Sequence, residues 1–189
     1  IAIGPGMSRD PETSWLVREL CKNIDKPKVI DADGLNAISE DKSVLKYIDS
    51  KTILTPHPGE MARLIDKTIS DVQSDHINVA QKFAVENGII LVIKGVPTVV
   101  AEPSGELYIN TTGNPGLASG GTGDVLTGII AGFIAQGLSM KASAILGVYI
   151  HGFAGDLAVK EFGEPGLIAG DLIKYIPKAI KYLMENEIE

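Results

Sequence analysis

Short runs of aliphatic and β-branched residues recur along this chain, and most end at a Gly, Pro or Asp turn that leads into a segment with helical periodicity. Every residue of the run 89–93 is apolar, which is typical of a parallel strand buried on both faces. Repeated alternation of strand and helix predicts an α/β fold, with a mostly parallel central sheet and helices on both faces. We interpret four such runs as parallel strands: 1–3, 28–30, 52–54 and 89–93.

The remaining segments complete this pattern. The runs 99–101 and 107–109 flank a Pro-Ser-Gly turn and predict a hairpin. Ser70, with Gln73 as its capping-box partner, predicts a long helix that ends at Gly88. Further helices are expected to begin at Asp10, Asp124, Ser139 and Asp171, the last delimited or kinked by Pro177. Three apolar residues of the first helix are interpreted as core packing: Trp15, Leu16 and Leu20.

Composition restricts the functions open to this chain. Its 189 residues fit one domain, 1–189, and 17 basic against 24 acidic residues argue against nucleic acid or an anionic membrane as partner. Cys21 is the only cysteine, which excludes an internal disulfide and suits a reducing cytoplasm. The uncharged stretch 125–140 falls short of the roughly 18 residues that span a bilayer, so we expect a buried helix there.

The chain begins in mid-strand, with neither an initiator Met nor the pattern of a signal peptide. A strand that runs straight into a glycine turn usually follows earlier structure. We therefore expect the domain to be N-terminally incomplete in this sequence and to belong to a longer polypeptide.

The densest group of unusual polar residues is the segment 114–124, Asn-Pro-Gly-Leu-Ala-Ser-Gly-Gly-Thr-Gly-Asp. Consecutive glycine amides ahead of a helix form an anion-binding nest, although the spacing matches neither a Walker A loop nor a dinucleotide fingerprint. Asp124 in this nest suits a general base that accepts the proton of a hydroxyl attacking a terminal phosphoryl group. The alternative is that Asp124 only caps the helix.

Other strand ends carry candidate residues with two readings each. Lys94 either balances nucleotide phosphates or extends to the protein rim. Asp31 and Asp33, two apart on an extended chain, either hold Mg²⁺ through water or form a turn with Asn36. His57, between two prolines, favours a ligand contact over a core histidine.

Three further residues have mainly structural readings. Glu60 contacts a ligand or stabilises a helix start. The run His-Gly-Phe-Ala-Gly-Asp at 151–156 favours close packing against the glycine-rich segment. His76 has no supporting neighbours and is expected at the surface.

Taken together, the motifs resemble the ADP/ATP-dependent NAD(P)H-hydrate dehydratase family, which has a ribokinase-like fold. The resemblance extends from the first residue to 176–177 and is carried by the segments 4–6, 31–36, 55–64, 94–98 and 113–126. It implies a repair enzyme that returns the S form of hydrated NADH or NADPH (NADHX, NADPHX) to the reduced cofactor. The hydroxyl is phosphorylated and phosphate is then eliminated, with ADP in preference to ATP as donor and with Mg²⁺.

The resemblance also implies site residues. Asp124 would be the catalytic base and would contact the hydrate. Nucleotide binding is expected at Lys94, Gly95, Val96, Pro97, Thr98, Asn114, Gly120, Gly121, Thr122 and Gly123. Hydrate binding is expected at Gly6, Asp33, Asn36, His57, Glu60 and Asp124. No metal ligand is assigned with certainty.

Two departures and two rival functions accompany the resemblance. Ser8 stands where the family usually has Gly, and the family's domain begins some tens of residues earlier, with a substrate-contacting segment. Family members imply a cytoplasmic homo-oligomer, in many bacteria fused to an epimerase domain. The rivals are a small-molecule kinase of the hydroxyethylthiazole or hydroxymethylpyrimidine type, which His57 in its Pro-His-Pro-Gly-Glu frame argues against, and an inactive nucleotide-binding assembly module.

Overall fold

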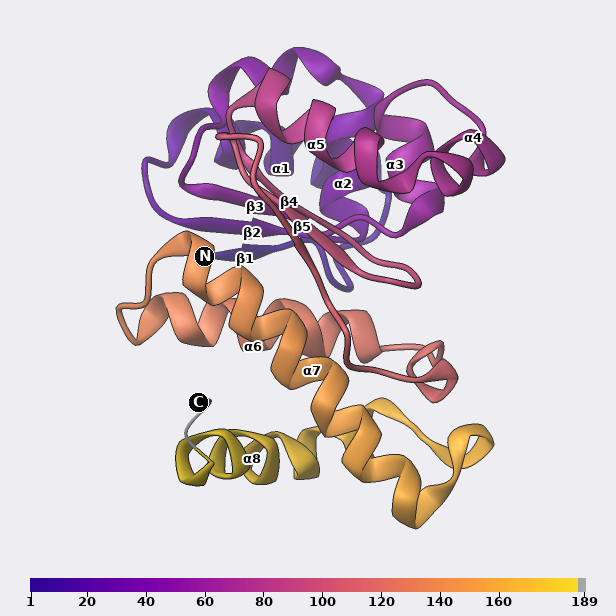
Figure 1. The fold of residues 1–189 in the computed structure, drawn as a ribbon. Coiled ribbons are helices and arrows are strands. Elements are labelled where there is room, and N and C mark those ends of the chain that lie inside the picture. The colour runs from indigo at the N-terminus through magenta and orange to yellow at the C-terminus, as the bar shows by residue number, and fades with distance from the viewer. Residues whose placement is uncertain (187–189) are drawn as a thin grey trace.

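The computed structural model describes residues 1–186, which form one six-stranded sheet with helices on both faces (Figure 1). The strands lie in chain order, β1 to β4 parallel to one another, and β5 and β6 add an antiparallel hairpin. This arrangement confirms the predicted mostly parallel α/β sheet. The strands are β1 (Ala2–Ile3), β2 (Lys28–Ile30), β3 (Thr52–Leu54), β4 (Ile90–Ile93), β5 (Val99–Ala101) and β6 (Leu107–Ile109).

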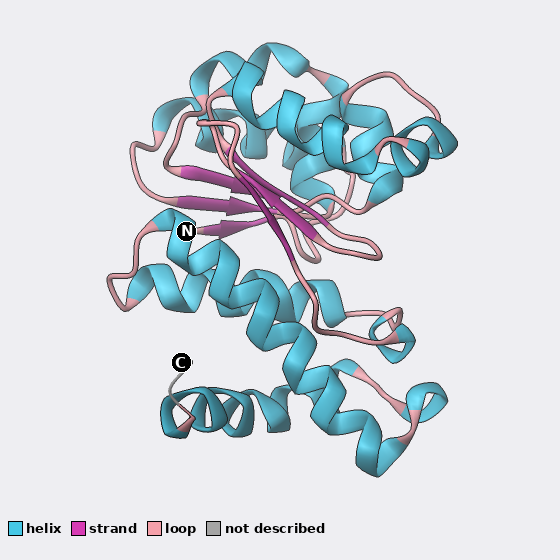
Figure 2. Cartoon of the chain, in the orientation of Figure 1, coloured by secondary structure: helices cyan, strands magenta, loops and turns pink. Residues whose placement is uncertain are grey.

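The helices divide between the two faces of the sheet (Figures 1 and 2). One face is covered by α1 (Pro11–Asn23), α2 (Asp33–Glu40), α3 (Pro58–Leu64), α4 (Ile69–Ser74) and α5 (His76–Asn87). The other is covered by α6 (Thr122–Ala135) and α7 (Met140–Phe162), and α8 (Ala169–Glu185) packs on α7 as a further layer. Short 3-10 helices occupy Lys42–Tyr47, Pro115–Leu117 and Glu164–Gly166.

Successive residues of β4 enter different cores, which is why this strand is apolar throughout. Leu91 and Ile93 pack beneath α1–α5, whereas Ile90 and Val92 pack against α6 and α7. All four are at most 3% exposed. A strand alternates its side chains between the two faces of a sheet, so covering both faces removes every polar position.

The helix predicted from Ser70 to Gly88 is two helices. Thr68, not Ser70, caps α4: the Thr68 hydroxyl accepts from the Asp71 amide, and the Asp71 carboxylate accepts from the Thr68 amide. The chain leaves helical geometry at Asp75, where φ is −134°, and α5 then ends as predicted at Gly88. The expected partner Gln73 plays no part in this cap.

The prediction for α1 is correct for Leu20, which packs against the core, and wrong for Trp15 and Leu16. Trp15 is 59% exposed and Leu16 is 44% exposed, whereas Val17 and Cys21 enter the core. Ser14, Val17 and Cys21 are spaced three and four residues apart and therefore share one helix face. The two apolar residues beside that face point away from the core.

The last three helices differ from expectation mainly at their ends. α6 begins at Thr122, two residues before Asp124, and α8 begins at Ala169 and contains Pro177 in its interior. Ser139 caps α7 as predicted. By length and composition alone α7 is apolar enough to cross a membrane, but 50% of its apolar window is buried inside this fold.

Candidate active site

Four polar side chains meet at the carboxyl ends of β2, β3 and β4, and we call them the strand-end cluster: Asp31, Glu60, Lys94 and Thr127. Asp31 directly follows β2, and Lys94 directly follows β4. The Lys94 ammonium lies 2.7 Å from Asp31 Oδ1 and 3.8 Å from Glu60 Oε2. Thr127 of α6 donates to the second Asp31 oxygen at 2.9 Å. The Asp31 carboxylate, 1% exposed, thus ties two strands to α6.

Lys94 was predicted either to balance phosphates or to extend to the rim, and the structure gives it a third environment. Its side chain is 21% exposed and forms an ion pair with a buried carboxylate. Two carboxylates face this one ammonium, so the cluster retains excess negative charge. Thr127 was not predicted, because its only sequence signal is a hydroxyl in an apolar helix, 96 residues from its partner.

The glycine loop, residues 113–123, lies over this cluster. A Cβ placed on Gly123 would lie 3.3 Å from Lys94 Nζ and 3.7 Å from Asp31 Oδ2, so the loop backbone approaches the cluster closely. Gly121 has a φ of +85° and forms the N-cap of α6. Glycine is therefore required here for backbone geometry and for space. Gly120 is exposed, with open space around it, so the outer side of the loop faces solvent.

Asp124 lies in the first turn of α6 and is exposed. Within residues 1–186 no donor hydrogen-bonds its carboxylate, unlike the occupied carboxylates of the cluster below. A helix N-terminus stabilises negative charge through its dipole and free amides. The arrangement leaves one solvent-facing carboxylate beside an anion-binding backbone, as base chemistry at a phosphoryl group requires.

Asn114 was predicted to bind nucleotide, but both ends of its amide are occupied within the protein. Its Nδ2 donates to Asp156 Oδ1 at 2.9 Å, and its Oδ1 accepts from the Gly116 amide at 3.0 Å. Asn114 thus shapes the start of the glycine loop. The run 151–156 was predicted to pack closely against this loop, and Gly155 against Leu117 and His151 against Thr122 confirm it. The two hydrogen bonds of Asp156 were not predicted, since a lone carboxylate in a helix gives no sequence signal of its long-range partners.

The residues of the predicted 94–98 segment lie on the far side of Lys94 from α6. Gly95, Val96 and Pro97 are exposed, and the Thr98 hydroxyl donates to the Gly95 carbonyl at 3.2 Å. A cavity of about 720 Å³ opens beside them. Its other lining residues are Pro58 and residues 73–78, at the junction of α4 and α5.

His76 was expected at the surface, but it lies half-buried under this segment. A Cβ on Gly95 would come within 2.8 Å of its ring, so the glycine makes room for the imidazole. Burial lowers the pKa of His76. His76 therefore supports the 95–97 segment and does not extend into solvent.

His57 was predicted to contact a ligand, and the structure gives it a further role as the N-cap of α3. Its Nδ1 accepts from the Gly59 and Glu60 amides at 2.9 and 3.3 Å, and Glu60 Oε2 accepts from the His57 amide at 2.7 Å. Because Nδ1 accepts, neutral His57 carries its proton on Nε2, which lies 3.4 Å from Glu60 Oε1. Burial lowers the pKa of His57 despite the opposing charge of Glu60.

Asp31 and Asp33 do not converge, contrary to the reading that two carboxylates share one Mg²⁺. Ala32 between them has a φ of +49°, so the chain there is not extended. Asp33 turns away and accepts from the Ser8 amide at 2.9 Å and from Asn36 Nδ2 at 3.3 Å. The alternative turn with Asn36 is the observed one.

The remaining predicted hydrate residues gather near the ends of β1 and β2. Gly6 is exposed with a φ of +70°, next to the Ser8 that binds Asp33. Asn36 accepts from Arg63 Nε at 3.1 Å, which connects this group to α3 below His57. Gly6, Asp33, Asn36 and His57 therefore occupy one side of the strand-end cluster.

Comparison with known proteins places this chain in a family. A family model described as NAD(P)H-hydrate dehydratase matches residues 1–178. A bifunctional NAD(P)H-hydrate repair enzyme of Moorella thermoacetica is 50% identical over 189 residues, covering 100% of this chain and 36% of the relative. This chain thus spans about a third of the length of that relative.

Solved structures agree with this result. An ADP/ATP-dependent NAD(P)H-hydrate dehydratase of Bacillus subtilis, co-crystallised with ATP and Mg²⁺, is 32% identical, with a TM-score of 0.83 over 96% of this chain and 65% of that one. A ribokinase-like superfamily protein of Enterococcus faecalis is 30% identical, with a TM-score of 0.85 over 96% of this chain and 62% of that one. The fold is therefore ribokinase-like, as the resemblance implied.

Proposed function

Since the chain belongs to the NAD(P)H-hydrate dehydratase family, we propose that it returns the S form of hydrated NADH or NADPH to the reduced cofactor, with a nucleotide as phosphoryl donor. Water that has added across a ring double bond leaves a hydroxyl, which is a poor leaving group. Transfer of a phosphoryl group to that hydroxyl creates a good one. Elimination of phosphate with loss of a ring proton then restores the double bond, and ADP leaves as AMP or ATP as ADP.

The observation that carries this proposal is the exposed Asp124 carboxylate beside the glycine loop at the start of α6. In the proposed first step Asp124 accepts the hydroxyl proton as the oxygen attacks the terminal phosphorus. The amides of Gly120 to Gly123 point their partial positive charge at the transferred group and stabilise it in the transition state. Lys94, fixed beneath Gly123 by Asp31, adds positive charge at the same edge.

The charges around Lys94 fit a divalent cation that arrives with the nucleotide. Within the described chain no three His, Cys, Asp or Glu residues group closely enough to hold a metal ion by themselves. Mg²⁺ is commonly bound through one or two carboxylates together with substrate phosphates and waters. We propose that Asp31 and Glu60 attract this ion by charge from beneath the loop and are not its direct ligands, because their two charges exceed the single Lys94 charge. When bound, the ion neutralises charge on the phosphates.

The hydrate is proposed to bind on the side formed by Gly6, Asp33, Asn36, His57 and Glu60. The Nε2–H of neutral His57 would donate a hydrogen bond to a carbonyl or phosphate oxygen of the substrate. We also propose a cytoplasmic homo-oligomer and, from the length of the Moorella relative, an epimerase domain in the same polypeptide.

An absorbance assay with the full chain tests the proposal. The protein is mixed with chemically prepared S hydrate of NADH, Mg²⁺ and either ADP or ATP. We expect the reduced-nicotinamide absorbance to rise with nucleotide present and to stay flat without it, with ADP the more effective donor. A nucleotide-independent rise contradicts the proposed chemistry. Nucleotide consumption without a rise, together with phosphorylation of a small alcohol, would instead indicate the kinase reading.

A further inference from the structure

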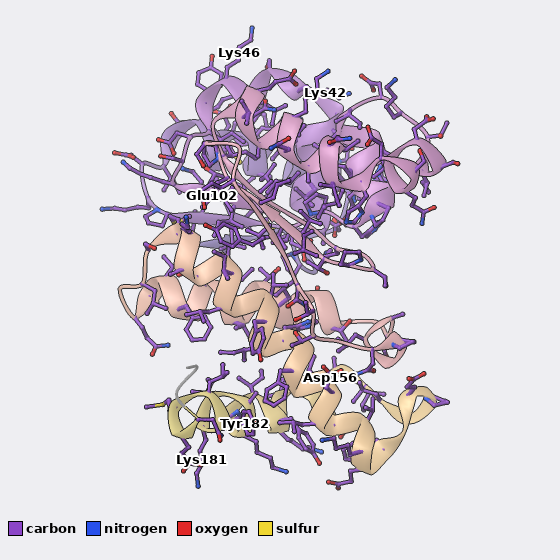
Figure 3. All side chains as sticks on the ribbon, in the orientation of Figure 1. Lys42, Lys46, Glu102, Asp156, Lys181 and Tyr182 are labelled. Atoms are coloured by element: carbon purple, nitrogen blue, oxygen red, sulfur yellow. The ribbon has the colours of Figure 1, made fainter. Side chains whose placement is uncertain are left out.

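Four residues of α7 contact the glycine loop, and they fall on one face of the helix. Counted from His151, the other three lie one, four and five positions further along the helix: Gly152, Gly155 and Asp156. At the helical repeat these four positions form a stripe along one face of α7. Figure 3 shows Asp156 on α7, near the segment that joins β6 to α6. None of the four belongs to the predicted nucleotide or hydrate residues.

Asp156 holds the beginning of the loop with both carboxylate oxygens. Oδ2 accepts from the Gly113 amide and Oδ1 from Asn114 Nδ2, each at 2.9 Å. Asn114 extends this hydrogen-bond network, since its Oδ1 accepts a hydrogen bond from the Gly116 amide. One half-buried carboxylate therefore fixes the backbone at Gly113 directly and at Gly116 through Asn114.

His151 holds the end of the loop. Its Nε2 lies 2.8 Å from the Thr122 carbonyl oxygen, so the ring donates this hydrogen bond. The Thr122 hydroxyl in turn donates to the Leu117 and Ser119 carbonyls at 2.7 and 2.8 Å. The helix thus fixes the residue that stands between Gly121 and Gly123.

The two glycines of the stripe bring the helix close enough for these bonds. A Cβ on Gly152 would collide with Thr112, and one on Gly155 would lie 2.8 Å from a Leu117 methyl carbon. Thr112 also donates to the Tyr149 carbonyl at 2.9 Å. The loop lies directly on α7, while its other side at Gly120 is open to solvent.

We infer that Asp156 and His151 are positioning residues, which preorganise the glycine loop for nucleotide phosphates by fixing its first and last turns from α7. The inference rests on the proposed function for the identity of the ligand. An anion nest binds well only when its amides converge before the ligand arrives. A loop that faces solvent has no other packing on its outer side to provide that order.

Asp156→Asn tests the first turn, because an amide has one acceptor where the carboxylate has two, and its NH₂ would face another donor. We expect the Kd for ADP, or for ATP if that is the donor, to rise about tenfold, which is the scale of one hydrogen bond to a charged group. The kcat at saturating nucleotide should stay within about threefold, since Asp156 touches no reacting group. Amide hydrogen exchange at Gly113 should accelerate.

Glu161→Gln is the matched control, because it removes another α7 carboxylate whose hydrogen bond runs to Tyr175 of α8 and not to the loop. We expect its nucleotide Kd to equal that of the wild type. A folded Asp156→Asn protein with unchanged nucleotide Kd, or one in which kcat alone falls, would overturn the inference.

His151 provides an independent pair of variants. His151→Gln places an N–H near the position of Nε2 and should keep nucleotide affinity. His151→Phe leaves the Thr122 carbonyl without its donor and should weaken nucleotide binding. Equal affinities of the two variants would contradict the inference even if Asp156→Asn fails to fold. If wild-type protein binds neither nucleotide, the proposed function fails, and exchange at residues 113–122 in the same variants still tests the positioning roles.

Discussion

The strand-end cluster and the glycine loop lie against each other but are constructed in opposite ways. Both oxygens of the Asp31 carboxylate are hydrogen-bonded within the protein, and the group is 1% exposed. In the loop, Gly120 is exposed and the Asp124 carboxylate has no donor among the described residues. In the cluster, the buried Asp31 carboxylate has its hydrogen-bond partners within the protein, whereas the loop leaves polar groups open to solvent.

Because of this difference, we give the two regions different roles: the cluster supports the site, and the loop takes part in the proposed chemistry. A satisfied buried network is rigid but has little capacity left to bind, whereas free amides and a free carboxylate cost little in water and become strong partners when a ligand excludes that water. The cluster supports the loop from below, and we propose that the loop contacts the substrates. Variants in the two regions should fail in different ways.

The largest expected effect is on turnover by Asp124→Asn. The amide cannot accept the hydroxyl proton, so kcat should fall about 10³-fold, within the usual range for a general base. Nucleotide Kd, measured by calorimetry, should change little because the loop amides remain. Near-normal turnover in this variant would remove Asp124 from its proposed role.

Asp31→Ala should instead reduce stability. It leaves Lys94 without its 2.7 Å partner and should lower the free energy of unfolding by about 4 kcal/mol, as when one member of a buried pair is removed. Urea unfolding measures this loss. Asp33→Ala is the control, because the groups that Asp33 bonds are more exposed. This substitution should lower the free energy of unfolding by about 1 kcal/mol. Equal losses would show that the cluster is not the rigid part.

Acid should weaken the attachment of α7 to the loop. Burial lowers the pKa of His151 to about 4, against about 6.5 for an unfolded histidine, so the unfolded chain binds more protons between these values. His151 therefore stabilises the protein fully above pH 6.5, and this contribution is lost as pH falls toward 4, by about 3 kcal/mol. His151→Gln should flatten that part of the stability profile. An unchanged profile would mean that His151 is not buried neutral.

The smallest expected effect is that of Gly123→Ala, where the two regions touch. The added methyl would press on Lys94 at 3.3 Å, and we expect the KM for nucleotide to rise about tenfold. Gly128→Ala, further along α6, has open space around it and should stabilise the helix by up to about 1 kcal/mol. Similar nucleotide KM values for the two variants would contradict close contact between loop and cluster.

Sequence reasoning predicted the fold because each strand is signalled locally, by an apolar run and the turn after it. It placed the start of α4 wrongly because Ser70 with Gln73 and Thr68 with Asp71 both have capping-box spacing, and only the structure shows which pair forms. For α1, the phase was set by Val17 and Cys21, which are smaller than the exposed Trp15.

The site was predicted only in part for a related reason. Asp124 and the glycines form one contiguous segment, so their proximity needs no tertiary information. The partners of Asp31 lie 63 and 96 residues away, and those of Asp156 lie 42 and 43 residues away. No local pattern encodes these individual pairings. The run 151–156 predicted that this part of α7 packs against the glycine loop, but the hydrogen bonds themselves emerged only from the fold.

We propose above all that the glycine loop and Asp124 promote phosphoryl transfer to a substrate hydroxyl. The most direct test follows AMP, inorganic phosphate and NADH together in one reaction of the full chain with ADP, Mg²⁺ and the S hydrate of NADH. We expect all three products to appear in equal amounts and Asp124→Asn to slow all three alike. NADH formed without AMP, or AMP formed with a stable phosphorylated product and no NADH, would contradict the proposal.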